Sequence, residues 1–316
     1  MRILVYECVS AGGLGRAVPD SLAREGRAMR DAVVEDFQRL RGVEVVTLTS
    51  PDVFADTAAT CAWTLVIAPE FDDHLHSLSQ TVLHVGGRLL GSQPAAIRLT
   101  GDKLATTDFW RERGIPHPRT QLLDATEFAS FAPPFVMKPR CGAGSQATFL
   151  IRNRDDLMNS WSPAFHECPD GEFIVQPYIL GQAASVALLI GAHGTSALLP
   201  ARQHLSRDGR FRYLGGSLPL PAPLAERATV LALQAAAGIE GLGGYVGVDL
   251  VLGDDGIDYA IEINPRITTS YLGLRRLCRL NLAELMLKAA HGEELHPLAW
   301  AAGEVRFGID SCQEIS

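Results

Sequence analysis

Short apolar runs alternate with amphipathic stretches over the first ninety residues. Residues 2–9 and 43–48 are rich in β-branched side chains, whereas residues 23–41 place apolar side chains at near-helical spacing. A third apolar run covers residues 64–71, and a helix-like segment at 74–85 leads into a fourth run at 88–92. Strands that alternate with helices in this way predict a parallel sheet with helices packed on its faces.

Polar and small residues follow two of these predicted strands. Ligands of open parallel sheets bind at the carboxyl ends of the strands. These ends therefore supply a first set of candidate substrate residues, although ordinary turn chemistry explains each of them equally well. The candidates are Glu7, Ser10, Gly12, Gly13 and Glu70.

The pattern changes at about residue 100, where a helical segment at 102–114 ends in a glycine and two prolines follow. The later apolar runs predict an antiparallel sheet with helices between its strands. We expect strands at 134–140, 149–153, 173–179, 184–190, 195–205, 245–253 and 258–265, and helices at 155–161, 224–238 and 281–291.

These patterns predict the α/β fold class, with α+β lobes, in three parts. An N-terminal α/β domain covers residues 1–95, a central lobe with a glycine-rich turn covers 96–178, and a C-terminal lobe covers 179–316. A chain of 316 residues with 47% hydrophobic content is long enough for two or three such units.

Charge and cysteine usage exclude several function classes. The net charge is −8 and no block of like charges is present, so nucleic acid is not an expected partner. The apolar run at the N-terminus is too short for a signal peptide or a membrane span, which predicts a cytoplasmic protein without membrane contact. The six cysteines form no C-x-x-C pair, which argues against a disulfide framework and a zinc site.

The first chemical motif is a lysine on a predicted strand followed by a glycine-rich turn: Lys138, then Gly142, Gly144 and Ser145. Glycines let the backbone approach phosphate oxygens closely, and the lysine adds positive charge beside them. The turn is neither a Walker A loop nor a dinucleotide-binding fingerprint. A β-hairpin turn beside a structural lysine would have the same pattern.

The second motif places oxygen donors on two late strands. Asp249 interrupts an apolar strand, and Glu262 and Asn264 are two residues apart, so they point to the same face of their strand. Such donors suit Mg²⁺, with Mn²⁺ as an alternative, and Arg266 could neutralise charge on a phosphoryl group. Two half-exposed strands with solvated acids are the alternative interpretation.

Taken in order, the motifs GDKLAT around Lys103, VMKPRCGAGS, FIVQPY, Asp249 and E-x-N-P-R resemble the ATP-grasp superfamily over residues 90–290. The resemblance implies an ATP-grasp fold with a preceding parallel α/β domain. It also implies that Lys103, Lys138 and the glycine turn bind the phosphates of ATP, and that the carboxylates and Asn264 bind magnesium. The adenine would lie at the hinge formed by Gln176, Pro177 and Tyr178.

One departure from the family pattern concerns the ribose. Many family members place an acidic residue after the hinge to bind it. Residues 181–185, GQAAS, contain none, so ribose recognition is open.

The phrases APEFDDHL, GQAASVALLI and EINPRITTSYLGLR are also similar to the small ATP-grasp ligases typified by tyramine–glutamate ligase of methanofuran biosynthesis. This resemblance implies an ATP-dependent carboxylate–amine ligase that forms an amide through an acyl phosphate, in a methanofuran- or methylofuran-type cofactor pathway. Its partners would be a small carboxylate, an amine and, as in relatives, a second copy of the chain.

For that reaction we expect Arg266 and Lys138 to be catalytic, with Arg266 steadying the acyl phosphate. The substrate pocket would draw on Thr268, Thr269, Ser270, Tyr271 and Arg202 with its neighbour Gln203. Two alternative functions remain. One is a peptide or polyglutamate ligase with another acceptor, and the other is an ATP-binding regulatory subunit without turnover.

Overall fold

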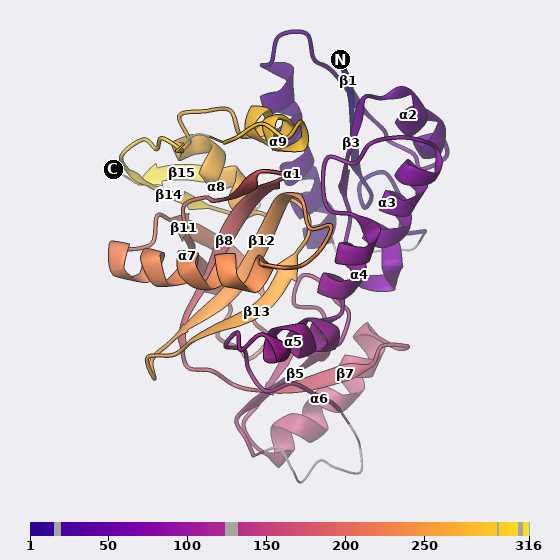
Figure 1. Ribbon diagram of the computed structural model, residues 1–316. Coiled ribbons are helices and arrows are strands. Elements are labelled where there is room, and N and C mark those ends of the chain that lie inside the picture. The colour runs from indigo at the N-terminus through magenta and orange to yellow at the C-terminus, as the bar shows by residue number, and fades with distance from the viewer. Residues whose placement is uncertain (16–19, 124–131, 296, 309–311, 316) are drawn as a thin grey trace.

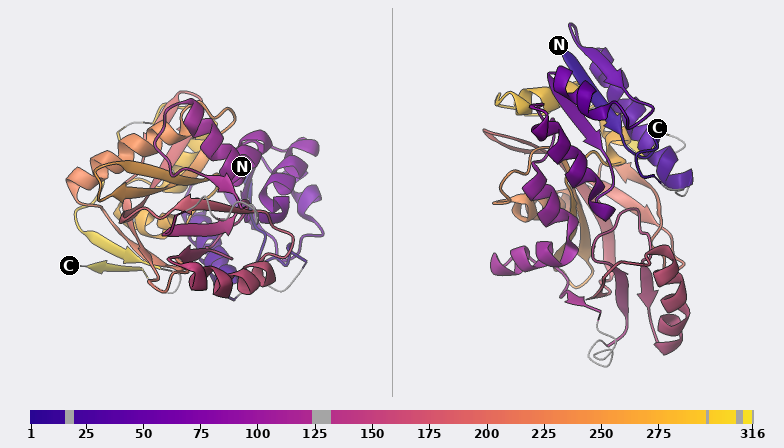
Figure 2. Two further views of the ribbon diagram at one scale, coloured as in Figure 1. Left: turned by 90° about the horizontal axis from the view of Figure 1, so that it is seen from below. Right: turned by 90° about the vertical axis from the view of Figure 1, so that its right-hand side faces the viewer.

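The computed structural model describes residues 1–15, 20–123, 132–295, 297–308 and 312–315 (Figure 1). Its strands form three sheets of three, four and eight strands. The four-stranded sheet and its helix project from one end of the molecule, and the N-terminal sheet lies toward the other end (Figure 2).

The N-terminal sheet has the parallel order β2–β1–β3, as the alternating pattern predicts. The predicted fourth strand at 88–92 is wrong: it is reduced to one isolated bridge between Leu89 and Thr64. The elements of this region are β1 (Arg2–Glu7), α1 (Asp20–Gln38), β2 (Glu44–Thr47), α2 (Phe54–Thr60), β3 (Trp63–Ile67), the 3₁₀ helix η1 (Phe71–Asp73), α3 (His74–His84) and α4 (Pro94–Gly101).

Side chains of β1 are buried on both faces of this sheet. Ile3 and Val5 pack in a core with α1, whereas Leu4 and Tyr6 pack in a second core with α2 and α3. A sheet covered on both sides explains why β1 is a continuous apolar run and not an alternating one.

The small lobe is an antiparallel sheet with the order β4–β7–β5–β6. Helix α6 packs on it around buried Phe149, Ile151 and Phe173. The elements here are α5 (Lys103–Glu112), β4 (Gln121–Leu122), β5 (Phe135–Pro139), β6 (Phe149–Ile151), α6 (Arg154–Glu167) and β7 (Phe173–Pro177).

The large sheet has the order β13–β12–β8–β10–β11–β14–β15, and β9 pairs with β8. The predicted run 195–205 is divided into two strands by Leu198 to Pro200. The elements are β8 (Gly181–Gly191), β9 (Gly194–Ala197), β10 (Ala201–Leu205), β11 (Tyr213–Leu218), α7 (Ala222–Ala236), β12 (Gly244–Gly253), β13 (Asp258–Asn264), α8 (Ser270–Leu277), α9 (Leu282–Ala290), β14 (Glu304–Phe307) and β15 (Cys312–Ile315).

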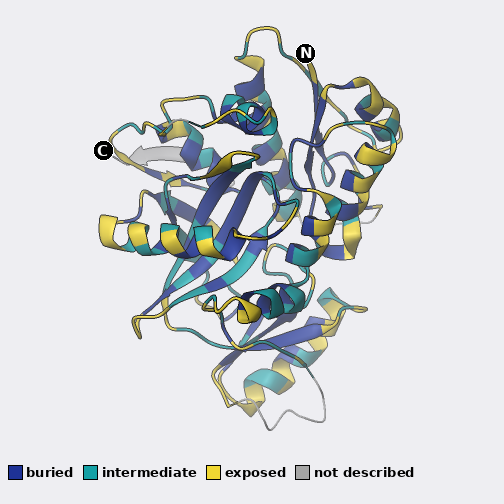
Figure 3. Ribbon diagram, in the orientation of Figure 1, coloured by how far each residue is buried: buried dark blue, intermediate teal, exposed yellow. Residues whose placement is uncertain are grey.

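Helices cover both faces of the large sheet, so strands β8 and β12 are buried (Figure 3). Helix α7 packs on one face through Ala228, Leu231 and Ala235. On the other face, α8 and α9 share a core with α1, in which Leu274 and Met286 pack together with Val33 and Phe37.

Buried polar contacts reinforce this joint between the N-terminal and C-terminal regions. The Asp36 carboxylate of α1 accepts hydrogen bonds from Arg275 Nη2 at 2.6 Å and from Tyr271 Oη at 2.8 Å, both on α8. Because these groups are buried, loss of one partner alone would leave the other unpaired, which is costly. The contacts join the N-terminal region to the large-sheet region through α1 and α8.

Each predicted part of the chain contains one sheet, with α4 crossing the predicted boundary at residue 95. The residue limits of the three domains stay a prediction. Helices α2, α4 and α8, the 3₁₀ helix η1 and strands β11, β14 and β15 were not predicted. In the described part of the chain, no helix is both long and apolar enough to cross a membrane.

Candidate active site

A cleft of about 780 Å³ lies between the small lobe and the large sheet. Its walls combine β5, the following loop and β7 with β8, β10, β12 and β13, and α1 adds one residue. Most of the predicted site residues line this one cleft: Lys103, Lys138, Gly142, Gly144, Ser145, Gln176, Pro177, Tyr178, Arg202, Asp249, Glu262, Asn264, Arg266, Thr268, Thr269 and Ser270.

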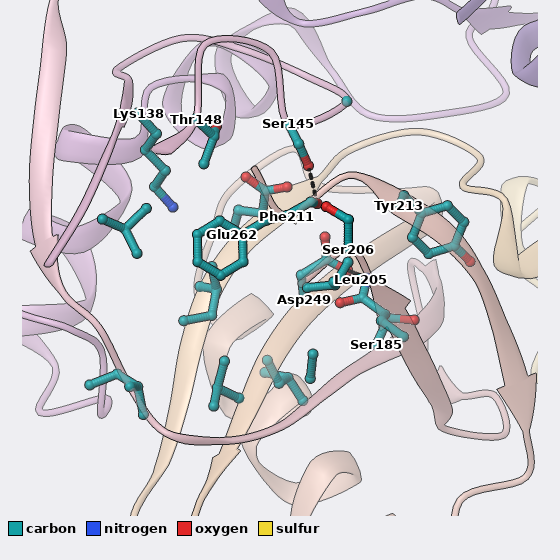
Figure 4. A pocket seen from close by; sticks show the side chains of 18 of the residues that line it. Lys138, Ser145, Thr148, Ser185, Leu205, Ser206, Phe211, Tyr213, Asp249 and Glu262 are labelled. Atoms are coloured by element: carbon teal, nitrogen blue, oxygen red, sulfur yellow. Dashed lines mark hydrogen bonds between the residues drawn. The ribbon is translucent and has the colours of Figure 1, made fainter. Parts of the chain in front are cut away.

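The glycine-rich loop is shaped by residues in the left-handed region. Gly144 has φ 65° and Ser145 has φ 58°, so only the first of these two is free of steric cost. Ser145 Oγ donates to the carbonyl oxygen of Phe211 at 2.7 Å, which ties the loop to the turn between β10 and β11 (Figure 4). The loop therefore bridges the small lobe and the large sheet across one side of the cleft.

Two buried lysines stand beside this loop. Lys103 Nζ donates to the Gly142 carbonyl oxygen at 2.8 Å and lies 3.4 Å from Glu262 Oε2. Burial lowers the pKa of Lys138 to about 8, and the nearby Lys103 ammonium adds to the lowering while Glu262 opposes it. Two ammonium groups held together in a buried place favour a polyanionic ligand, since a phosphate would relieve their mutual repulsion.

The two strand motifs meet as the sequence predicts. Asp249 of β12 pairs in register with Glu262 of β13, and Gly247 pairs with Asn264. Asn264 Nδ2 donates to Asp249 Oδ2 at 3.2 Å, and Gln203 Nε2 of β10 donates to Asp249 Oδ1 at 2.9 Å. The three predicted donors are therefore adjacent on one floor of the cleft.

The two carboxylates strongly affect each other. Burial and the neighbouring Glu262 raise the pKa of Asp249 to about 8. Burial would raise the pKa of Glu262 as well, but Lys103 and Lys138 outweigh it and lower that pKa. A divalent cation between the carboxylates would remove this repulsion, so the donor set fits Mg²⁺.

No third Asp, Glu, His or Cys joins these carboxylates within the described residues. Magnesium commonly completes its six oxygen ligands with waters and nucleotide phosphates. Asp249, Glu262 and Asn264 would then hold the ion against the phosphates that the lysines bind.

The predicted adenine hinge lies at the end of β7. Gln176 is buried, and its amide donates to Thr120 Oγ1 at 2.8 Å, so this side chain supports the hinge from within the lobe. The Tyr178 ring lies 5.9 Å from that of Phe211. Gln182 also lines the cleft, and no carboxylate from residues 181–185 is present to bind a ribose.

Arg266 is fixed by an ion pair with the N-terminal domain. Its Nε lies 2.9 Å from Glu70 Oε1, and both side chains are largely buried. Burial would lower the pKa of Arg266, but Glu70 outweighs it and raises the pKa, so the guanidinium stays charged. Glu70 does not line the cleft; it acts on the site by holding Arg266.

Hydroxyl groups follow Arg266 at the start of α8. Thr268 Oγ1 and Ser270 Oγ lie 2.9 Å apart, and the Tyr245 hydroxyl lies 2.8 Å from Ser270 Oγ. Tyr271 differs from its neighbours because it is fully buried and donates to Asp36. It does not line the cleft, so the geometry does not support the predicted substrate contact.

The candidates at the end of β1 and in the turn after it also do not line the cleft. The buried Glu7 carboxylate accepts hydrogen bonds from the backbone amides of Val9 at 2.9 Å and Ser10 at 2.7 Å. Arg30 Nη1 donates to Ser10 Oγ at 3.0 Å. Glu7 and Ser10 thus stabilise the turn after β1, and Gly12 and Gly13 belong to the same turn.

Sequence reasoning missed many residues of the cleft wall, and two of them are acidic or aromatic side chains from distant elements. Glu25 comes from the N-terminal half of α1, and Tyr213 begins β11. Figure 4 shows Tyr213 on the opposite side of Asp249 from Lys138. No local motif marks either residue, because both reach the cleft only through the packing of distant elements.

Comparison with known proteins agrees with this geometry. The profile of the ATP-grasp domain family matches residues 100–270. The chain belongs to the ATP-grasp family. The profile of the pre-ATP-grasp domain matches residues 28–97, which confirms the predicted fold class with its preceding parallel α/β domain.

Two proteins of similar sequence are named as ligases. The chain is 31% identical to tyramine–L-glutamate ligase of Methanocaldococcus jannaschii, over 93% of this chain and 90% of that one. It is 29% identical to the enzyme of the same name from Methanocaldococcus fervens, over 83% and 78% of the two chains. The predicted class, an ATP-dependent ligase that forms C–N bonds, is confirmed at this level.

Solved structures share the fold. An ATP-grasp superfamily protein from Archaeoglobus fulgidus superposes with a TM-score of 0.73 and 26% identity, covering 97% of this chain and 92% of that one. D-alanine–D-alanine ligase of Bacillus anthracis, solved with ATP, has a TM-score of 0.71 and 18% identity, with 92% and 97% covered. The second likeness shows the common fold alone.

Proposed function

We propose that this ATP-grasp enzyme phosphorylates a small carboxylate with ATP and joins the resulting acyl phosphate to an amine. The observation that carries the proposal is the convergence of three groups on one cleft: the Lys103 and Lys138 ammonium groups, the Asp249 and Glu262 carboxylates, and the Arg266 guanidinium. Cations, a metal-binding floor and a fixed guanidinium are what a phosphoryl transfer to a carboxylate needs.

Each group has a defined task in this proposal. The lysines and the loop amides bind the phosphates of ATP and draw charge from the γ-phosphate as it is transferred. Asp249, Glu262 and Asn264 would hold Mg²⁺, which neutralises phosphate charge when bound. A carboxylate oxygen of the acid attacks the γ-phosphorus and ADP leaves, giving the acyl phosphate.

Arg266 supports the second half of the reaction. The neutral amine attacks the acyl carbon, the negative charge that develops on the acyl oxygen is stabilised by the guanidinium, and phosphate leaves. Because Glu70 fixes Arg266 from the N-terminal domain, the guanidinium needs little rearrangement during the reaction. Such preorganisation is a main source of electrostatic catalysis.

The acid is L-glutamate and the amine an arylethylamine or a furan-methylamine in our proposal, which would give a γ-glutamyl amide for a methanofuran- or methylofuran-type cofactor. The names of the Methanocaldococcus relatives support this choice. A homodimeric state and a cytoplasmic location stay predictions.

The test is ADP release from Mg-ATP with L-glutamate, alone and with a panel of amines that includes tyramine and furan-methylamines, followed by mass analysis. Amine-dependent ADP release with a matching condensation mass is expected. ATP binding without ADP release, in folded protein and with every pairing, would favour the regulatory-subunit alternative. ADP release only with amino acids or glutamyl peptides as acceptors would favour a peptide or polyglutamate ligase.

A matched pair of variants ties the activity to the site. Glu262→Gln should lower kcat at least about 100-fold, since it removes one of two carboxylates beside the transferred phosphoryl group. Glu112→Gln, a change of the same kind at an exposed position of α5, should leave the rate unchanged. Equal rates in both variants would refute the assignment of the metal site.

A further inference from the structure

The cleft extends beyond the part assigned to ATP. Lys138 and Tyr213 lie on opposite sides of Asp249 (Figure 4), so they mark two ends of the cleft. Glu25, Thr269 and Ser270 line the same cleft, and Arg266 lies beside them. This second end is where an acyl phosphate formed over the metal floor would meet its acceptor.

Glu25 is chemically distinct within this lining. Three acidic residues line the cleft in the described part of the chain, and the other two are Asp249 and Glu262. Those two face the lysines, whereas Glu25 belongs to α1 of the N-terminal domain. Magnesium and ATP binding therefore account for Asp249 and Glu262, but they give no role to Glu25.

The Glu25 side chain is held in place by one contact. Thr269 Oγ1 donates a hydrogen bond to Oε1, which orients the carboxylate from the start of α8. Among the described residues, Glu25 forms no ion pair with a Lys or Arg side chain, and its Oε2 accepts no hydrogen bond. An oriented carboxylate with one oxygen still available at a cleft wall can accept a hydrogen bond from a ligand cation.

The groups around Glu25 define what that ligand would be. Burial would lower the pKa of Arg266, whereas Glu70 and, to a smaller extent, Glu25 raise it. Burial raises the pKa of Tyr213 well above its usual range, and Glu25 adds to this effect. The carboxylate therefore lies near both the guanidinium that would hold the acyl phosphate and an aromatic ring.

We infer that Glu25 binds the ammonium group of the amine substrate, while Tyr213 contacts the apolar part of the same molecule. The inference rests on the proposed function and adds the residue that selects the acceptor. A protonated amine held by Glu25 would lie beside the acyl phosphate held by Arg266, and it would release one proton to solvent water before its nitrogen attacks. Because the carboxylate recognises charge, alcohols of the same shape should be poor ligands.

The first measurement compares tyramine with its uncharged isostere, 2-(4-hydroxyphenyl)ethanol, in the wild-type enzyme with Mg-ATP and L-glutamate. The alcohol should inhibit amide formation with a Ki about 10- to 100-fold higher than the KM of tyramine, the range of one charge-assisted hydrogen bond in a partly buried site. Equal values would overturn the inference without the need for any variant.

The second measurement uses Glu25→Gln, with Asp31→Asn, an exposed acid of the same helix, as the control. Glu25→Gln should raise the KM for tyramine about 10- to 100-fold, leave the KM values for L-glutamate and ATP within about twofold, and abolish the preference for tyramine over the alcohol. The conservative change Glu25→Asp should recover part of the tyramine affinity. Asp31→Asn should behave as wild type.

Other outcomes are equally informative. A rise in the KM for L-glutamate alone would assign Glu25 to the α-ammonium group of the acid and overturn the inference, while the proposed ligase would stand. Unchanged KM values in Glu25→Gln would also overturn it. Wild-type protein that forms no amide with any amine would instead refute the proposed function, and the inference with it.

Discussion

Asp102 supports the phosphate end of the cleft, although it does not line it. It is the N-cap of α5, and its Oδ1 accepts hydrogen bonds from the backbone amides of Leu104 at 3.0 Å and Ala105 at 3.1 Å. The same carboxylate accepts two hydrogen bonds from Arg140, Nε to Oδ1 at 2.9 Å and Nη2 to Oδ2 at 2.6 Å. Since Lys103 follows Asp102 directly, these contacts fix the start of the helix that carries it.

Two substitutions separate the cap from the ion pair. Asn caps helices about as well as Asp, so Asp102→Asn removes mainly the pair with Arg140; Asp102→Ala removes both. The paired side chains are 19% and 30% exposed, so the pair should contribute about 1–2 kcal/mol, between surface and fully buried values. The cap adds about 1 kcal/mol, for a total of about 2–3 kcal/mol in the Ala variant.

The assay is hydrogen exchange of the α5 peptide, measured by mass spectrometry, because local opening is better defined than global unfolding in a chain with several units. Protection should fall about 5- to 30-fold in Asp102→Asn and about 30- to 150-fold in Asp102→Ala. The KM for ATP should rise in the same order, since a displaced Lys103 binds phosphate less well.

Glu172→Gln is the matched control for this pair. Glu172 is the other partner of Arg140, at 2.8 Å, but it is 63% exposed, so its loss should cost less than about 1 kcal/mol. Wild-type protection of α5 in Asp102→Asn, or an equal loss in Glu172→Gln, would refute the reasoning.

Three further predictions concern the lobes and the cleft floor. Arg210 Nη2 donates two hydrogen bonds to the Glu167 carboxylate, at 2.7 and 2.8 Å, and these join the large sheet to α6. Because Lys cannot reproduce both bonds, Arg210→Lys should speed ADP release several-fold in stopped-flow assays. Gly247→Ala should destabilise the protein by about 1–3 kcal/mol and impair turnover, because its Cβ would lie 2.5 Å from Thr268 Cγ2. The contribution of Asp102 to the stability of α5 should depend on pH. Burial would raise the pKa of Asp102 in the folded protein, but hydrogen bonds from Arg140 and two backbone amides outweigh this effect and lower the pKa. This stabilisation is complete above the unfolded pKa of about 3.9 and is lost as the pH falls through the lower folded value. The hydrogen-exchange protection factors of α5 in wild type and Asp102→Asn should therefore converge in acid.

Controls make these three predictions decisive. Gly91→Ala places its Cβ in open space, so it should be tolerated where Gly247→Ala is not. Arg212→Lys changes an exposed arginine of the same turn and should leave ADP release unchanged. A stability difference between wild type and Asp102→Asn that persists undiminished to pH 2 would contradict the pKa argument.

The sequence determined those features that depend on local order. Alternation of strands and helices predicts the N-terminal parallel sheet because hydrophobic periodicity is a property of neighbouring residues. The spacing of Glu262 and Asn264 predicts their common face because side chains of a strand alternate. The short runs that became α2, β11 and β14 were missed because packing, and not periodicity, decides such elements.

Tertiary structure alone decided which side chains share the cleft. Glu7 ends one buried strand and Glu70 follows another. Yet Glu7 binds backbone amides of its own turn, whereas Glu70 holds Arg266, 196 residues away. Glu25 occupies one of many polar positions on an amphipathic helix, and it lines the cleft because α1 packs against α8 and α9. Contacts between residues far apart in the chain depend on how whole elements pack, which no local pattern of residues encodes.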